Sequence, residues 1–365
     1  MARLGVTEST ATTMTVDGRE VLAFGGCNYL GLAHHPEVVR ALCEEAGRSG
    51  ISTTASRETT GNTGVHEALE AALASWMGQE AAILLAEGYT ANIALCQALA
   101  RDHGVALIDA KAHRSLRSAA TAAGMQVFEY EHRSPKSAAW LCRQYGDLGV
   151  AILTDGVFAA DGALAPLPEL LGVLPARRAT LVVDDCHGVC VLGARGSGSV
   201  EHFGLRDERV AITTTLAKGV GCYGGAVIGR RRLVDAVREH ADVYRRSTPV
   251  PTPLARAALT AVDLVAREPG MLARLRSNTA RLRDGLIALG LASHEGRVPI
   301  FTFVLEPASR MQPLHEALMH EGVYAPLIEY PGGPTARFFR ITVTATHRDE
   351  DIDRLVAGLR RHVGG

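Results

Sequence analysis

The sequence carries no surplus of charge, because 38 basic and 39 acidic residues give a formal net charge of −1 over 365 residues. Electrostatic attraction therefore gives no reason to expect nucleic acid or an anionic membrane as a partner. No stretch approaches the roughly 18 apolar residues of a membrane span. The segment from Met1 to Arg19 also lacks the basic-then-apolar order of a secretion signal. We expect a cytoplasmic protein.

Paired cysteines are also lacking. The seven cysteines are odd in number and show no paired metal-ligand spacing, which favours free thiols in a reducing cytoplasm. Cys186 and Cys190 flank His187, so zinc is conceivable there, but no second ligand pair is visible and we predict no metal site. A GxSxG nucleophile elbow is absent as well, which argues against the hydrolases that use one.

What is present is a regular alternation of short apolar segments with helical ones. Apolar runs between helices are typical of a mostly parallel sheet covered by helices, the α/β class. The expected strands are 81–85, 105–109, 126–130, 150–154, 180–184 and 210–214, and the expected intervening helices are 91–100, 115–123, 137–145 and 167–174.

Both ends of the chain have a different pattern. Residues 15–30 predict a hairpin with its turn at Asp17-Gly18, followed by a helix over 36–48. A long helical stretch over 253–289 leads to a strand, helix, strand and helix, which predict a smaller α+β domain. These last elements are 299–305, 314–321, 338–343 and 349–362. We therefore expect an N-terminal segment (1–35), a large domain (36–265) and a small domain (266–365).

Polar residues that could do chemistry follow the predicted strands. In parallel sheets, ligands gather at the carboxyl ends of the strands. Gly88, Tyr89 and Thr90 open a helix, whose N–H groups favour a phosphate, and the alternative is an ordinary turn with Thr90 as its cap. His113 could lie flat on an aromatic ligand or simply cap a helix. The long Ser/Thr/Gly-rich segment 50–64 is a candidate functional loop.

Asp184 and Lys218 are the most informative of these residues. A carboxylate at the end of a buried apolar strand is costly unless it is paired, and a pyridinium nitrogen is a suitable partner. At about 4 Å and an effective dielectric constant near 20, such a pair contributes up to roughly 4 kcal/mol. His187 could then contact a ring hydroxyl. Lys218 follows the run Thr213-Thr214-Thr215, and a desolvated amine there could attack a bound aldehyde.

Taken together, these residues describe a pyridoxal phosphate site, with the cofactor acting as an electron sink. In chain order they supply a phosphate cradle, a stacking imidazole, a carboxylate for the ring nitrogen and a lysine for the aldehyde.

The order of these segments resembles the α-oxoamine synthases, fold-type I pyridoxal phosphate enzymes that join an amino acid to an acyl thioester. The resemblance runs from Asn28 to about Leu359. The matching segments include Asn28-Tyr29-Leu30-Gly31-Leu32, Ser56-Arg57, Gly88-Tyr89-Thr90-Ala91-Asn92, His113-Arg114-Ser115, Asp155-Gly156, Asp184-Asp185-Cys186-His187-Gly188, Thr215-Leu216-Ala217-Lys218 and Arg340 with His347.

The resemblance implies a role for each matching residue. Lys218 would hold the cofactor as an imine and move the α-proton, Asp184 would pair with the ring nitrogen, His187 with the ring oxygen, and His113 would stack on the ring. Phosphate and ring would be held by Gly88, Tyr89 and Thr215. Asn28 and Arg340 would bind the amino acid carboxylate, and Ser247-Thr248 would reach the phosphate of the neighbouring subunit in a homodimer with shared active sites.

The chain also departs from the family pattern. The usual Ser-Met-Asp-Gly-Asp is Ala159-Ala160-Asp161-Gly162-Ala163, so a hydroxyl near the ring is missing, and the usual Asp-Glu pair is Asp184-Asp185. The segment before Asn28 is shorter than usual. Glu329 stands where the family tends to have a small hydroxyl residue. The core chemistry is therefore expected to be intact and the acyl-donor side altered.

These observations favour a decarboxylating C-acyltransferase that condenses a small α-amino acid with an acyl-CoA or an acyl carrier protein. The serine at position 56 favours alanine or serine over glycine as the amino acid substrate. Two alternatives stay open: aldol cleavage, racemisation or transamination on the same fold, and a binding protein that keeps only a vestigial pocket.

Overall fold

A computed structural model describes residues 4–292 and 297–363. The chain divides into two compact units. Unit 1 comprises Met1–His34, Ala159–Ala163 and Glu268–Gly365, and unit 2 comprises His35–Phe158 and Leu164–Arg267. The N-terminal segment therefore belongs to the same unit as the C-terminal part of the chain.

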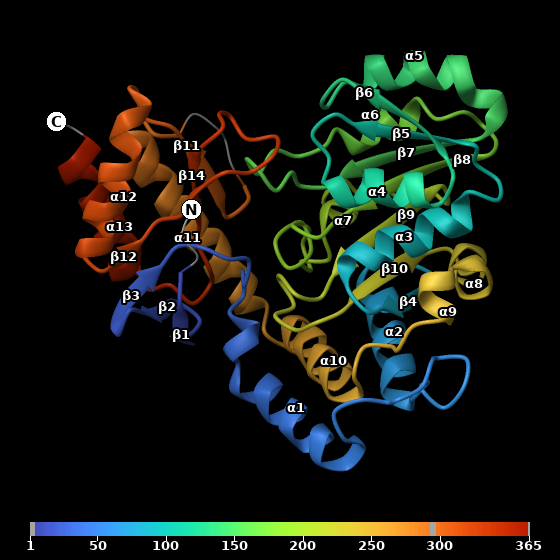
Figure 1. The fold of residues 1–365 in the computed structure, drawn as a ribbon, viewed down its shortest axis with the longest axis horizontal. Coiled ribbons are helices and arrows are strands. Elements are labelled where there is room, and N and C mark those ends of the chain that lie inside the picture. Colours follow the sequence, from blue (N-terminus) through green and yellow to red (C-terminus); the bar gives the residue numbers. More distant parts are fainter. Residues whose placement is uncertain (1–3, 293–296, 364–365) are drawn as a thin grey trace. The chain divides into compact units, whose positions relative to one another are not determined.

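Unit 2 is built on a seven-stranded sheet with the strand order β4-β10-β9-β8-β7-β5-β6 (Figure 1). Strands β9, β8, β7, β5 and β6 are parallel, whereas β10 is antiparallel to both of its neighbours. The bounds are β4 (Ala81–Leu85), β5 (Val105–Asp109), β6 (Gln126–Tyr130), β7 (Val150–Asp155), β8 (Ala179–Asp184), β9 (Val210–Thr215) and β10 (Gly225–Gly229). The predicted mostly parallel sheet is confirmed.

Helices cover this sheet. Every residue of β4, β5, β7, β9 and β10 is buried, as expected for strands enclosed on both faces. Helix α3 packs on β9 and β10, with α4 beside it (Figure 1). The helices of unit 2 are α1 (Pro36–Ser49), α2 (Gly64–Trp76), α3 (Gly88–Leu99), α4 (Arg114–Ala122), α5 (Pro135–Tyr145), η2 (Gly146–Leu148), α6 (Leu167–Gly172), α7 (Ser199–His202), α8 (Arg231–His240), α9 (Asp242–Arg245) and α10 (Thr252–Arg267).

Unit 1 contains two small sheets. One has the order β1-β2-β3-β12 and the other β11-β14-β13. The strands are β1 (Val6–Ser9), β2 (Thr13–Val16), β3 (Arg19–Ala23), β11 (Ile300–Phe303), β12 (Val323–Tyr324), β13 (Leu327–Ile328) and β14 (Phe338–Thr342). The helices are η1 (Leu32–His34), α11 (Pro269–Ala288), η3 (Ala308–Arg310), α12 (Met311–His320) and α13 (Asp349–Val363).

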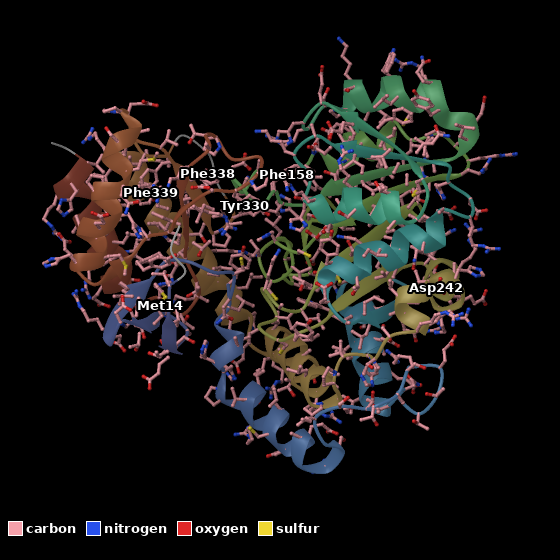
Figure 2. All side chains as sticks on the ribbon, viewed as in Figure 1. Met14, Phe158, Asp242, Tyr330, Phe338 and Phe339 are labelled. Carbon is pink, nitrogen blue, oxygen red and sulfur yellow. The ribbon has the colours of Figure 1, made fainter. Side chains whose placement is uncertain are left out.

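The core of unit 1 joins the two ends of the chain. The parallel pair β3–β12 places Leu22 opposite Val323. The rings of Phe303 and Phe339, the latter labelled in Figure 2, stack with their centroids 4.8 Å apart. Both sheets contribute to one buried apolar cluster, so the N-terminal strands and the C-terminal elements share one hydrophobic core.

The predicted elements agree with the structure in most places. The hairpin is confirmed, and positive φ values at Asp17 (50°) and Gly18 (72°) give the tight turn that matches strand twist. The single helix expected over 253–289 is wrong, because α10 ends at Arg267 and α11 begins at Pro269. A proline suits the first turn of a new helix better than the interior of a long one. Elements β1, β10, β12, β13, α7, α8 and α9 were not predicted.

Among the described residues, no helix is both long and apolar enough to cross a membrane. All seven cysteines are free thiols.

Candidate active site

The site of unit 2 lies where neighbouring parallel strands end. β7 ends at Asp155, β8 at Asp184 and β9 at Thr215. In the sheet register, Asp184 stands opposite Asp155 on one side and Thr213 on the other. Three polar strand ends therefore meet at one edge of the sheet, as the sequence predicts.

Asp184 is only 5% exposed, so its carboxylate needs donors to offset the loss of water. Its Oδ2 accepts a hydrogen bond from Asn92 Nδ2 at 2.8 Å, and its Oδ1 accepts one from the backbone N–H of Cys186 at 3.2 Å. Loss of solvent around the partly buried Cys186 thiol, together with the neighbouring Asp184 carboxylate, raises the pKa of this thiol well above its ordinary value.

Asn92 is the residue that ties the site together. It lies on α3, is 1% exposed, and its Oδ1 accepts a hydrogen bond from the Thr213 hydroxyl at 2.6 Å. Its Nδ2 donates to Asp184 and also to Ser115 Oγ at 2.9 Å. One amide thus joins α3, α4, β8 and β9. In the sequence, Asn92 ends the segment Gly88-Tyr89-Thr90-Ala91-Asn92, and nothing in that segment predicts this role.

Lys218 follows the end of β9, and its Nζ lies 2.8 Å from His187 Nε2. His187 follows Asp184 by three residues and is 6% exposed. The imidazole is therefore buried, and the amine that contacts it is partly buried. Two predicted catalytic residues, 31 positions apart in sequence, meet in this way.

His113 belongs to the same group. Its backbone N–H donates to the Asp155 carboxylate at 3.1 and 3.2 Å, and its Nδ1 accepts from the Ser115 N–H at 3.3 Å. It therefore caps α4, as the simpler interpretation expected. Burial lowers the pKa of its imidazole; Asp184 raises that pKa and Lys218 lowers it. The ring is neutral near pH 7 and feels both charges of the site.

The turn between β4 and α3 was predicted to hold a phosphate. Gly88 is buried and Thr215 is 8% exposed, and a Cβ at Gly88 would lie 2.8 Å from Thr215 Cβ. The turn is therefore in close contact with the end of the strand that leads to Lys218. Tyr89 is 40% exposed. The Thr90 hydroxyl donates to the Glu87 carbonyl at 2.8 Å and accepts from the Glu87 N–H at 3.2 Å, so in this structure it is engaged in a capping box.

Three other predicted residues lie in loops of unit 2. The carbonyl of Ser56 accepts from the N–H groups of Thr59 and Gly61 within the loop after α1, and its hydroxyl role stays a prediction. Ser247 Oγ donates to the Val243 carbonyl at 2.5 Å, and Thr248 is exposed. Their expected contact with a second subunit also stays a prediction.

Asn28 and Arg340 lie in unit 1, where the loop after β3 is bonded to β14. Thr342 Oγ1 donates to the Gly26 carbonyl at 3.0 Å, which fixes this loop against the strand. Asn28 Oδ1 accepts from the Ala33 N–H at 3.2 Å. Arg340 Nε donates to the Ala159 carbonyl at 2.7 Å, so the position that lacks the usual hydroxyl side chain holds the arginine through its backbone.

The residues of unit 2 fit a pyridine aldehyde phosphate. A buried carboxylate, a flat neutral imidazole and an amine meet at one sheet edge, and the glycine turn of α3 approaches the same strand end. Anionic, aromatic and nucleophilic partners are each supplied from a different element. Within residues 4–292 and 297–363, no three His, Cys, Asp or Glu side chains are grouped as metal ligands.

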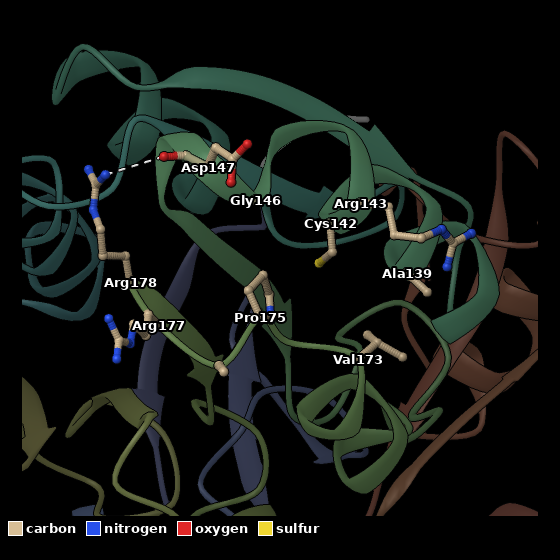
Figure 3. Close-up of a pocket in the computed structure, with 10 residues that line it drawn as sticks. Ala139, Cys142, Arg143, Gly146, Asp147, Val173, Pro175, Arg177 and Arg178 are labelled. Carbon is tan, nitrogen blue, oxygen red and sulfur yellow. Dashed lines mark hydrogen bonds between the residues drawn. The ribbon is translucent and has the colours of Figure 1, made fainter.

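A separate groove of about 710 Å³ lies elsewhere on unit 2 (Figure 3). It is lined by α5 and by the segment that leads into β8, including Cys142, Pro175 and Arg177. Arg178 crosses its edge and donates to the Asp147 carbonyl at 3.3 Å. This groove adjoins the amino end of β8, whereas Asp184 lies at the carboxyl end.

Comparison with known proteins agrees with this geometry. A profile of the family described as aminotransferase class I and II matches residues 19–359. The 8-amino-7-oxononanoate synthase of Thioalkalivibrio sulfidiphilus is 38% identical over 354 residues, which cover 96% of this chain and 90% of that protein. Sphingomonas wittichii serine palmitoyltransferase superposes with a TM-score of 0.91 at 25% identity, covering 97% of this chain and 91% of that one.

A second solved structure, of SPT with PLP as an internal aldimine, has a TM-score of 0.90 at 25% identity and covers 99% of this chain and 93% of that one. These matches cover nearly the whole chain, and the family profile over residues 19–359 includes every segment from Asn28 to His347 that carries the resemblance. The chain therefore belongs to the aminotransferase class I and II family, and within it to the α-oxoamine synthases, which are pyridoxal phosphate-dependent acyltransferases of fold type I.

Proposed function

We propose that this enzyme condenses a small α-amino acid, alanine or serine in preference to glycine, with an acyl thioester, and releases CO2 and an α-amino ketone. The observation that carries the proposal is the contact between Lys218 Nζ and His187 Nε2 at 2.8 Å, beside the strand that ends in Asp184. The relatives named 8-amino-7-oxononanoate synthase support the acyl-transfer class.

Pyridoxal phosphate, when bound, supplies an electron sink for the carbanion that acyl transfer requires. Asp184 would bind the protonated ring nitrogen, and its donor Asn92 keeps the carboxylate oriented. Proton transfer at the amino acid α-carbon is assigned to the Lys218 amine. His187 lies within hydrogen-bond distance of that amine. It would orient the amine and contact the hydroxyl group of the cofactor ring.

His113 would cover one face of the ring. Its pKa is lowered by burial, so the imidazole is uncharged and can stack without repelling the positively charged ring nitrogen. The Asp155 carboxylate holds the backbone N–H of His113, which positions this residue at the start of α4. Asp155 is itself buried next to Asp184, and both effects raise its pKa well above the ordinary value.

Asn28 and Arg340 are proposed to bind the substrate carboxylate, because a guanidinium fork matches a carboxylate in shape and charge. Ser56 is proposed to contact the amino acid, and Gly88, Tyr89, Thr90 and Thr215 the cofactor phosphate and ring. We further propose a cytoplasmic homodimer in which Ser247 and Thr248 serve the site of the second subunit.

The test is an assay of thiol release and CO2 release from acyl-CoA or acyl carrier protein thioesters with alanine, serine or glycine. Lys218→Arg keeps the charge but cannot form the covalent link to the cofactor, and we expect it to abolish both products. Lys136→Arg on α5 is the matched control. The chain has only three lysines, Lys111, Lys136 and Lys218, so borohydride reduction followed by peptide mapping identifies the attachment site directly.

Two results would contradict the proposal. One is the absence of both products with every pairing of amino acid and thioester. The other is a reduced cofactor adduct on Lys111 or Lys136. Retro-aldol products or exchange of amino groups without acyl transfer would instead favour a different carbanion reaction on the same fold.

A further inference from the structure

The N-terminus of α3 already carries an anion, the side chain of Glu87. Its Oε2 accepts a hydrogen bond from the backbone N–H of Tyr89 at 3.1 Å, and its Oε1 accepts one from Thr90 at 2.9 Å. The Thr90 hydroxyl bonds back to Glu87 and completes the capping box. A carboxylate at this position is favoured by the helix dipole as well as by the two N–H groups.

These N–H groups are the ones that a cofactor phosphate would need. The same helix binds Asp184 through Asn92, one turn further along, so the position of its first turn is fixed relative to the carboxylate proposed for the ring nitrogen. A phosphate attached to that ring would seek donors at the start of α3. Two anions therefore compete for one pair of donors.

The backbone of this turn cannot retreat to make room. A Cβ at Gly225 would lie 2.4 Å from the backbone C and O atoms of Glu87, and a Cβ at Gly88 would lie 2.8 Å from Thr215 Cβ. Strands β9 and β10 thus hold the turn from one side. Only the flexible side chain of Glu87 is able to leave, by rotation about its own bonds.

We infer that the Glu87 carboxylate occupies the place of the cofactor phosphate in the empty enzyme, and that it has to swing away each time pyridoxal phosphate binds. Glu87 is then a residue that sets the affinity for the phosphate end of the cofactor. This inference rests on the proposed function, because that function assigns the phosphate to α3. Removing the competing carboxylate should strengthen cofactor binding about tenfold, a factor equivalent to one typical helix cap.

The experiment measures binding rather than catalysis. Cofactor-free wild type, Glu87→Gln and Glu87→Ser are titrated with pyridoxal phosphate and with pyridoxal, followed by the visible absorbance of the bound cofactor and by equilibrium dialysis. Glu87→Ser retains a hydroxyl cap, so it keeps the test valid if Glu87→Gln folds poorly. The thermal midpoint of each cofactor-free protein is also measured against inorganic phosphate. Glu350→Gln removes an exposed carboxylate from the first turn of α13 and is the matched control.

We expect both Glu87 variants to bind pyridoxal phosphate about tenfold more tightly and to gain more thermal stability from inorganic phosphate, with pyridoxal affinity and the Glu350→Gln control unchanged. Equal or weaker affinity for pyridoxal phosphate in both variants overturns the inference, as does an equal gain for pyridoxal. In those cases, acyl transfer by the wild type would leave the proposed function intact. Tighter phosphate binding by the variants, together with no acyl transfer by the wild type, would support the inference about Glu87 and contradict the proposed function.

Discussion

Replacement of Asn92 by leucine tests the hydrogen-bond centre of the site. The substitution keeps the size of the side chain but removes an amide that makes bonds to Asp184, Ser115 and Thr213. All four side chains are at least 95% buried, so water cannot replace the lost bonds. The carboxylate of Asp184 would retain the backbone N–H of Cys186 as its donor.

The magnitude follows from these three bonds. A bond to a charged group contributes about 1.5–3 kcal/mol and a neutral one about 1 kcal/mol, and a buried partner left without a bond costs about 1–3 kcal/mol. Some of this is offset by the apolar burial of the leucine. We expect the free energy of unfolding to fall by about 3–4 kcal/mol, a large part of the stability of an ordinary domain. Pyridoxal phosphate affinity should fall about tenfold, because Asp184 loses its orientation.

Urea unfolding of the cofactor-free protein, followed by circular dichroism, measures the first quantity, and cofactor titration measures the second. Asn278→Leu is a matched control. Asn278 is also 1% exposed and its Nδ2 donates to the carbonyls of Thr344 and His347, each at 2.8 Å, but it lies in the core of unit 1. It should lose a similar amount of stability and leave cofactor affinity unchanged.

A double-mutant cycle sharpens the test. Thr213→Val removes one bond of the Asn92 amide and should cost about 1–2 kcal/mol in the wild type. In the Asn92→Leu background the partner is already gone, so the same change should cost almost nothing. Additive effects of the two substitutions, or an Asn92→Leu protein that binds cofactor as tightly as the wild type, would refute the reasoning.

Three further outcomes are expected. Gly88→Ala should weaken pyridoxal phosphate binding in a titration, because the new Cβ would lie 2.8 Å from Thr215 Cβ. In contrast, Gly47→Ala places its Cβ where no atom lies within 4 Å, so it should stabilise α1 by about 0.5–1 kcal/mol. Burial lowers the pKa of His347 from 6.5 to about 4. About 3 kcal/mol of stability, present above pH 6.5, should therefore be lost as the pH falls towards 4. His347→Gln should flatten this part of the pH dependence of stability measured by urea unfolding. Burial raises the pKa of Asp185 from 3.8 to about 7, so the stability that this protonated side chain contributes at low pH is lost as the pH rises from about 4 to 7. Asp185→Asn should therefore lose less stability than the wild type across that range.

Sequence patterns found the parallel strands because each is a short, wholly apolar run between helices. They missed β10, in which Gly225 and Gly229 stand at the ends of only three apolar residues. Glycine is uncommon within strands, and here it is required by packing, since a Cβ at Gly225 would overlap the backbone of Glu87. That contact joins segments far apart in the chain, and no local pattern records it.

The same limit applied to the candidate site. Asp184, Lys218, His113 and His187 could be singled out because each follows a recognisable strand. Asn92 looked like an ordinary helix residue, and only the folded chain brings it to a carboxylate 92 positions away. The capping role of Glu87 was likewise hidden, because a capping box usually has serine or threonine first and glutamate or glutamine three residues later, and here that order is reversed. A buried polar residue becomes informative when its partners are known.

Helix α3 has one consequence beyond its individual contacts. Glu87 caps the helix that carries Asn92, and the rise between Gly88 and Asn92 is about 6 Å, as the geometry of an α-helix dictates. The helix therefore fixes the spacing between the N–H groups proposed for the cofactor phosphate and the amide that binds Asp184. We expect a cofactor analogue whose side arm is one methylene longer to reach either the N–H groups at the start of α3 or the Asp184 carboxylate, but not both at once.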